Sequence, residues 1–217
     1  MGQRGLLATS IATLAALVIV SSASATPIAN SFGLANPGTT ITFDEIVFAQ
    51  GTLITTQYSA LGVEFSPGLR FDSQGVSNCC NGITGHYVGN NGGPFLDPFS
   101  VIFTFGSSQT QAAFALATNP TTSTFTALLN GNVVETFSSP THFNASGPYY
   151  FGFTGIAFNE IRVDISPSLD QGLIDNIQFG SSVPLPPALL LVLGAVVVAA
   201  ARRHGAGREQ ISSVDSA

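Results

Sequence analysis

The stretch from Ser123 to Phe137 reads STFTALLNGNVVETF and decides the fold class of this chain. Threonine, phenylalanine and valine, which favour strands, lie on both sides of an Asn130-Gly131 pair. Asn-Gly readily adopts the positive φ angles of the tight turns that join antiparallel strands. The stretch therefore predicts a β-hairpin, with its strands on either side of residues 130–132.

Short apolar or alternating runs, separated by clusters of glycine, proline, asparagine and serine, continue along the rest of the chain. Such runs are typical of β-strands. Between residues 26 and 182 no stretch has the periodicity of an amphipathic helix. The pattern predicts an all-β fold, a β-sandwich of two sheets packed face to face. The other expected strands are Thr40–Phe43, Gly62–Ser66, Val101–Phe105, Gln111–Ala117, Tyr150–Phe153, Ile156–Phe158, Glu160–Ile165 and Leu173–Phe179.

Two segments depart from this pattern. Residues 73–98 are rich in glycine and asparagine and predict a long surface loop, for which a functional role and disorder are competing explanations. Residues 26–38 are expected to form an extended leader. The predicted β-sandwich domain therefore covers residues 39–181.

The N-terminus has the three parts of a secretory signal peptide. Arg4 supplies a positive charge, Leu6–Val20 is apolar, and Ala23 and Ala25 have the small side chains that signal peptidase requires. We expect cleavage after residue 25, so residues 1–25 are excluded from the fold. The alternative is an uncleaved N-terminal membrane anchor.

The C-terminus carries a second apolar segment. Ala188–Ala201 has no charged or hydrogen-bonding side chain, and Arg202 and Arg203 follow it directly. Such a segment predicts one transmembrane helix, and positive charge after it is retained in the cytoplasm. We therefore expect the β domain outside the membrane and residues 204–217 as a cytoplasmic polar tail. A buried core helix is the alternative.

The charge balance restricts the partners. The chain has 6 Lys and Arg residues against 12 Asp and Glu, for a formal net charge of −6. Between residues 26 and 182 the only such cations are Arg70 and Arg162. Because there is no basic patch to bind phosphates, nucleic acid is not an expected partner.

Cys79 and Cys80 are the only cysteines, and they are adjacent. In an oxidising compartment free thiols are not the default state. A disulfide between these two neighbours is the leading interpretation, and free thiols and bonds to another chain remain open.

The C-terminal arrangement resembles the PEP-CTERM sorting signal of Gram-negative bacteria, in its VPLPA-like variant. The resemblance covers residues 183–203 and rests on the apolar run, on Arg202-Arg203 and on a short motif made of Val183, Pro184, Leu185 and Pro186. It implies recognition by an exosortase, a membrane transpeptidase, and association with extracellular polysaccharide and biofilm. A second proline at 187 and the extension after the arginines depart from the usual pattern, and they leave the cleavage point open.

The two ends of the β domain are similar to galactose-binding-like jelly-roll modules of exported bacterial proteins. The likeness lies in residues 41–44, 58–65 and 173–179, which read ITFD, YSALGVEF and LIDNIQF. Where such modules hold a structural calcium ion, its ligands come from the terminal strands. The resemblance thus implies Asp44, Glu45 and Asp175 as calcium ligands. The alternative is that these are solvated residues at strand ends.

The signatures of common enzymes are missing from the chain: there is no Gly-x-Ser-x-Gly, no His-Glu-x-x-His and no phosphate-binding glycine loop. His86 and His142 are well separated and are interpreted as ordinary loop residues. We therefore expect a non-catalytic protein, exported and held at the cell envelope by its C-terminal helix until processing, and then on the outer surface or secreted.

Two other functions remain open. A carbohydrate-binding module would stack sugars on aromatic faces, and the candidates are Tyr87, Tyr149 and Tyr150. A glycoside hydrolase would need two carboxylates across the scissile bond, and the sequence singles out no particular pair.

Overall fold

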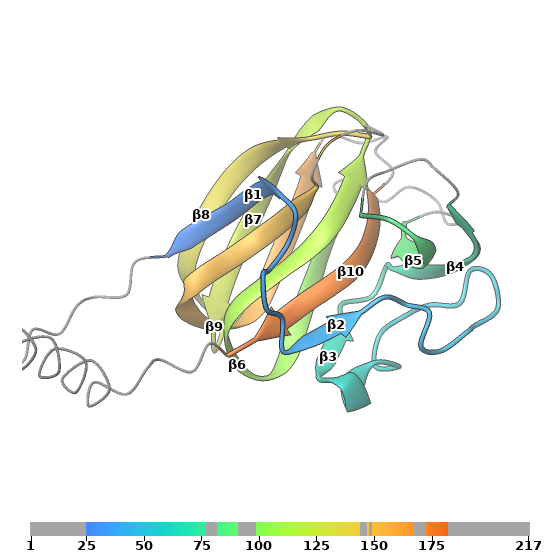
Figure 1. Cartoon of the computed structure of the whole chain (residues 1–217), viewed down its shortest axis with the longest axis horizontal. Coiled ribbons are helices and arrows are strands. Elements are labelled where there is room, and N and C mark those ends of the chain that lie inside the picture. The colour runs from blue at the N-terminus through green and yellow to red at the C-terminus, as the bar shows by residue number, and fades with distance from the viewer. Residues whose placement is uncertain are drawn as a thin grey trace, which may run out of the picture.

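The computed structural model describes residues 25–76, 82–90, 99–143, 147, 149–166 and 172–181. Within these ranges the chain is all β, which confirms the predicted fold class (Figure 1). Ten strands pair antiparallel in one hydrogen-bonded network, in the order β4-β5-β10-β6-β9-β7-β8, with β1 on β9, β2 on β10 and β3 on β6. The strands are β1 Thr26–Ser31, β2 Thr39–Ile41, β3 Val63–Phe65, β4 Arg70–Val76, β5 Gly85–Gly89, β6 Phe99–Thr118, β7 Thr121–Leu129, β8 Asn132–Thr141, β9 Tyr150–Ser166 and β10 Gly172–Gly180.

The long strands β6 and β9 organise the network. Residues 99–104 of β6 pair with residues 160–165 of β9, and residues 111–115 pair with residues 150–154. The register shifts between these two halves, where β6 reads Gly-Ser-Ser at 106–108. Small residues there leave few side chains to fix the pairing, so the ladder can bend without being broken.

Each half of this ladder has its own neighbours. The first half lies between β3, which pairs with residues 103–105, and the β7–β8 hairpin, which pairs with the C-terminal part of β9. The second half lies between β10 and β1. Two groups of strands are thus joined through the same pair of continuous strands.

The strand boundaries differ from the sequence prediction in one respect. Expected strands at 101–105 and 111–117 are parts of β6, and those at 150–153, 156–158 and 160–165 are parts of β9. Glycines at 106 and 155 interrupt the apolar pattern in the sequence, but hydrogen bonding to neighbouring strands continues on both sides of them.

The predicted hairpin is confirmed. β7 and β8 pair from Thr121 and Thr141 up to Leu129 and Asn132. The turn residues Asn130 and Gly131 have φ angles of 52° and 77°, as a tight turn between antiparallel strands requires.

Two segments expected to lie outside the sheet contribute strands. Residues 26–31 of the expected leader form β1, which pairs with residues 150–154 of β9. Within the expected long loop, residues 73–76 continue β4 and residues 85–89 form β5, which pairs with β4 and β10. Both segments become strands because their backbones pair with strands that are distant in the sequence. Local composition does not reveal such pairing.

One phenylalanine-rich core lies between the strands. Its buried residues come from strands β2, β3, β4, β5, β6, β7, β9 and β10 and from the segments between them. Phe125 of β7 stacks on Phe137 of β8 and on Phe151 of β9, with ring centroids 4.8 Å and 4.9 Å apart. Residues from both groups of strands share this cluster, which therefore joins them. A second, smaller buried cluster consists of Ile83, Tyr87, Ala115, Ala117 and Leu173.

Several sequence predictions fall outside the described residues: the signal peptide, the sorting signal with its membrane helix, the polar tail, and Cys79 with Cys80. The part that the structure describes contains no helix with the length and hydropathy to cross a bilayer.

The β6–β9 ladder gives a stability prediction. A Cβ atom at Gly152 of β9 would lie closer than 3.0 Å to the carbonyl oxygen of Ala112 on β6, which backbone hydrogen bonding holds in place. We expect Gly152→Ala to lower the free energy of unfolding by about 3 kcal/mol, measured by urea unfolding followed by circular dichroism.

Gly106→Ala is the control, because the nearest atom to its added Cβ lies 3.9 Å away. Its unfolding free energy should change by less than about 1 kcal/mol. Equal losses in the two variants would show that close approach at Gly152 is not the cause.

Candidate functional site

The three predicted calcium ligands come from two segments that the sheet brings together. Asp44 and Glu45 follow β2, and Asp175 lies in β10. β2 pairs with β10 through Ile41 and Ile177, and β5 pairs with β10 through Val88 and Ile174. The segment after β2, the start of β5 and the middle of β10 therefore meet at one place, which we call the acidic site.

Asp175 is the buried member of the acidic site, with no exposed surface. Its Oδ2 accepts hydrogen bonds from the backbone N–H of Thr84 at 2.8 Å and from Nδ2 of Asn176 at 3.0 Å. Its Oδ1 accepts from the backbone N–H of Asn176 at 2.6 Å. Asn176 also donates to the carbonyl of Gly82 at 2.6 Å, so this side chain connects β10 to the segment before β5.

A local irregularity of β10 accompanies this arrangement. Asn176 has a φ of 50°, and the pairing of β10 with β6 shifts between Asp175 and Gln178. Asparagine is among the few residues other than glycine that adopt positive φ readily. The sequence Asp-Asn thus supplies both the buried carboxyl and the backbone bend.

Burial controls the protonation of Asp175. Desolvation raises the pKa of this carboxyl to about 8, against the lowering effect of the hydrogen bonds from Thr84 and Asn176. The negative charges of Asp44 and Glu45 raise the pKa further. Of the arginines in the described ranges, Arg162 pairs with Asp164 and Arg70 donates to the carbonyl of Gly51.

Asp44 is held by the start of β5. Its Oδ1 accepts a hydrogen bond from the backbone N–H of His86 at 3.0 Å and lies 2.5 Å from the Nδ1 atom of the same residue. The imidazole stacks on Phe71, with ring centroids 5.2 Å apart. A Cβ atom at Gly85 would lie closer than 3.0 Å to both oxygens of this carboxylate, and Gly85 has a φ of +66°. Only glycine fits there without strain.

Glu45 is engaged locally. Its Oε1 accepts hydrogen bonds from the backbone N–H and the hydroxyl of Thr42, at 2.8 Å and 3.0 Å. The three carboxylates are therefore positioned by the protein's own donors, while each carboxylate keeps lone pairs that these bonds do not use.

Tyr58 adds a feature that the sequence did not predict. Its side chain is fully buried among Phe43, Phe48 and Phe65, and its hydroxyl has no hydrogen-bond partner in the described part of the protein. Burial raises the pKa of this phenol, and the charges of Glu45, Asp44 and Asp175 raise it further. A buried hydroxyl without a partner costs about 1–3 kcal/mol.

The chemistry of these donor atoms suits a calcium ion, but their arrangement suits it only in part. Hard oxygen donors are the ligands that calcium prefers, although the Nδ1 atom of His86 lies against one oxygen of Asp44. Within the described ranges, however, no three side chains of His, Cys, Asp or Glu lie close enough together to hold a metal ion. Calcium at Asp44, Glu45 and Asp175 therefore stays a prediction.

The sugar-contact candidates are mostly interior. Tyr87 and Tyr149 are 6% and 2% exposed, and the hydroxyl of Tyr87 donates to Asp72 at 2.9 Å. Neither ring offers a face to a sugar, which corrects the expectation for these two residues. Tyr150 is half-buried. His142 packs edge-on against Tyr149, with 5.3 Å between the ring centroids.

Three comparisons of the chain, with protein-family models, with curated proteins and with solved structures, gave no match.

The calcium prediction is tested by thermal unfolding of the purified protein in excess Ca²⁺ and in chelator. At free calcium about 100 times the dissociation constant, bound metal should raise the unfolding free energy by about 2.7 kcal/mol. Asp44→Asn should remove most of this gain, whereas Asp164→Asn, whose partner Arg162 lies in β9, should keep it. An identical midpoint in calcium and in chelator would contradict the prediction.

The buried carboxyl gives a pH prediction in the presence of chelator. The pKa of Asp175 is raised in the folded state from 3.8 to about 8, so between these values the folded protein keeps a proton that the unfolded chain releases. This contribution to stability is complete below about pH 4 and is lost as pH rises toward 8.

Urea unfolding at a series of pH values measures the contribution of Asp175 to the free energy of unfolding. The Asp175→Asn variant, which cannot ionise at this position, should lack the decline seen in the unmodified protein between pH 4 and 8. Parallel pH profiles for the two proteins would show that Asp175 ionises normally.

Proposed function

We propose that this chain is an exported, non-catalytic β-sandwich protein, held at the cell envelope by its C-terminal segment as an exosortase substrate and associated with extracellular polysaccharide. The observation that carries the proposal is the pairing of an N-terminal export signal with the three-part segment at residues 183–203. An apolar helix backed by Arg202 and Arg203 would retain the chain in the membrane during sorting.

The proposed ectodomain is a two-layer sandwich of jelly-roll type. The register supports this form, because each half of the β6–β9 ladder has a different set of neighbouring strands. In this interpretation one layer contains β3 and the β7–β8 hairpin, and the other contains β1, β2, β4, β5 and β10. β6 and β9 pass from layer to layer at the register shift, and the phenylalanine core fills the space between.

The state of the acidic site favours a binding or structural role over hydrolysis. Asp175 is fully buried, and Asp44 and Glu45 are each hydrogen-bonded by neighbouring backbone groups. A glycosidase needs an acid and a base that both reach the scissile bond, which a fully buried carboxyl does not do. These contacts support a structural role, in which the acidic site holds the β2, β5 and β10 segments together.

Anchoring is tested by fractionating cells that express the full chain. We expect the protein in the envelope fraction, and we expect the double variant Arg202→Ala/Arg203→Ala to be less efficiently retained because its cytoplasmic charge is lost. The matched control Arg202→Lys/Arg203→Lys keeps the charge and should fractionate as the original does. Recovery of all three proteins in the cytosol would contradict the proposal.

A further inference from the structure

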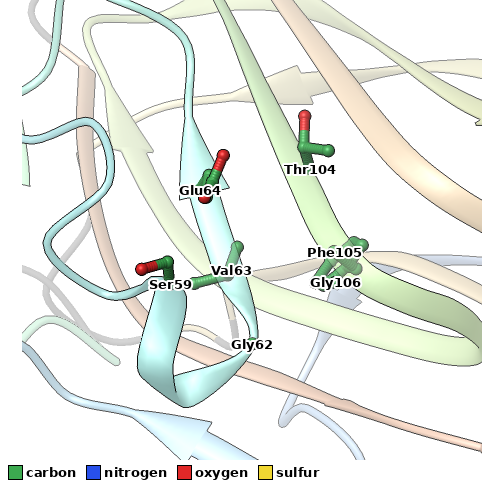
Figure 2. Close-up of a pocket in the computed structure, with 7 residues that line it drawn as sticks. All are labelled: Ser59, Gly62, Val63, Glu64, Thr104, Phe105 and Gly106. Atoms are coloured by element: carbon green, nitrogen blue, oxygen red, sulfur yellow. The ribbon is translucent and has the colours of Figure 1, made fainter.

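A small hollow lies at the edge of the sheet, between β3 and β6 and beside the helical turn η1 Ser59–Leu61 (Figure 2). Its volume is about 190 Å³, and its lining consists of Ser59, Gly62, Val63, Glu64, Thr104, Phe105 and Gly106. It is separate from the acidic site, and none of the three predicted calcium ligands lines it.

Two glycines create this hollow. Val63 pairs with Phe105 in the β3–β6 ladder, and at the next position the N–H of Gly106 donates to the carbonyl of Gly62 at 3.0 Å. Gly62 has a φ of 93°, which ends η1 and directs the chain into β3. Because neither residue of this pair has a side chain, the floor of the hollow is bare backbone.

Three oxygen-bearing side chains surround the floor. Glu64 and Thr104 are directly paired across β3 and β6 and are both exposed, and Ser59 comes from the turn (Figure 2). Within the ranges that the structure describes, their side-chain oxygens make no hydrogen bond. They are therefore available to a ligand without first breaking bonds inside the protein.

The charge of the surroundings restricts the ligand. Thr104 also pairs with Glu160 of β9, so a row of Glu64, Thr104 and Glu160 crosses three strands on one face of the sheet. Two carboxylates in this row repel an anion. The described residues contain no three-ligand metal group here, so the row is not a ready-made metal site. A neutral ligand rich in hydroxyl groups is neither an anion nor a metal ion. Each of its hydroxyls can donate a hydrogen bond to a carboxylate.

The size of the hollow restricts the ligand further. Pockets for drug-sized ligands occupy about 300–1,000 Å³, and this hollow is smaller, so it admits a single ring. Val63 and Phe105 give the lining apolar surface beside the glycine backbone, whereas the side chains of Ser59, Glu64 and Thr104 are polar. Apolar surface next to hydroxyl and carboxylate groups matches one face and the edge of a sugar ring.

We propose that the β3–β6 hollow is a binding subsite for one neutral sugar residue of an extracellular polysaccharide. The Glu64 carboxylate accepts hydrogen bonds from the sugar hydroxyls, the Thr104 hydroxyl accepts or donates them, and Gly62 and Gly106 let the ring approach the backbone. The proposal rests on the proposed association with polysaccharide and gives that association a location, which differs from the tyrosines that the sequence indicated.

The test is calorimetric titration of the purified full-length protein in detergent with methyl glycosides of neutral hexoses and short oligosaccharides made from them. We expect saturable binding of at least one probe, and at least tenfold weaker binding in Glu64→Gln. Gly106→Ala, which adds a methyl group with 3.9 Å of clearance, should also weaken binding while remaining folded. Glu135→Gln on β8 is the matched control and should bind within twofold of the original.

Three outcomes would overturn the subsite: no saturable binding by any probe, equal affinity in all four proteins, or tighter binding of the anionic methyl glucuronoside. Circular dichroism of each variant separates loss of binding from loss of fold. Fractionation of cells tests export and anchoring independently, so a failed titration with normal envelope location rejects the subsite alone.

Discussion

The antiparallel ladder between β6 and β9 is the constraint on which the rest of the structure depends. It begins at Phe99 and Ile165 and continues, through one irregular region, to Ala115 and Tyr150. β1, β3, β7 and β10 pair directly with one of these two strands, and the other four are connected to them through one or two intermediate strands. The irregular region lets the same two strands serve two groups of neighbours, and the phenylalanine core then closes between them.

The acidic site and the β3–β6 hollow both follow from this arrangement. β10 pairs with the second half of β6 and is the strand on which β2 and β5 meet, which brings Asp44 and His86 to Asp175. β3 pairs with the first half of β6, which sets Glu64 opposite Thr104 and leaves the two glycines in register. Asp175 of the acidic site is buried, whereas Asp44, Glu45 and the polar side chains of the hollow are exposed. The buried carboxyl explains why we assign the two sites different roles.

The sequence predicted what local chemistry decides. Asn130-Gly131 fixes its turn through backbone preference alone, and the alternation around Val63 predicts a strand with one buried face. It failed where distant pairing decides: β1 looked like a leader because its partner is more than a hundred residues away. The sequence pointed to Asp44, Glu45 and Asp175 as one set, which stays a prediction, but the partnerless hydroxyl of Tyr58 and the burial of Tyr87 were not foreseen. Both depend on which way a side chain faces in the finished core, and aromatic composition does not determine that.

The central claim is that export and C-terminal sorting determine where this protein acts. Mass spectrometry of the mature chain, isolated from cells that have an exosortase, tests it most directly because it identifies both ends at once. The account predicts a chain that starts at Thr26 and lacks residues beyond the sorting segment, recovered from the envelope or the medium. A soluble cytosolic chain that starts at Met1 and ends at Ala217 would contradict it.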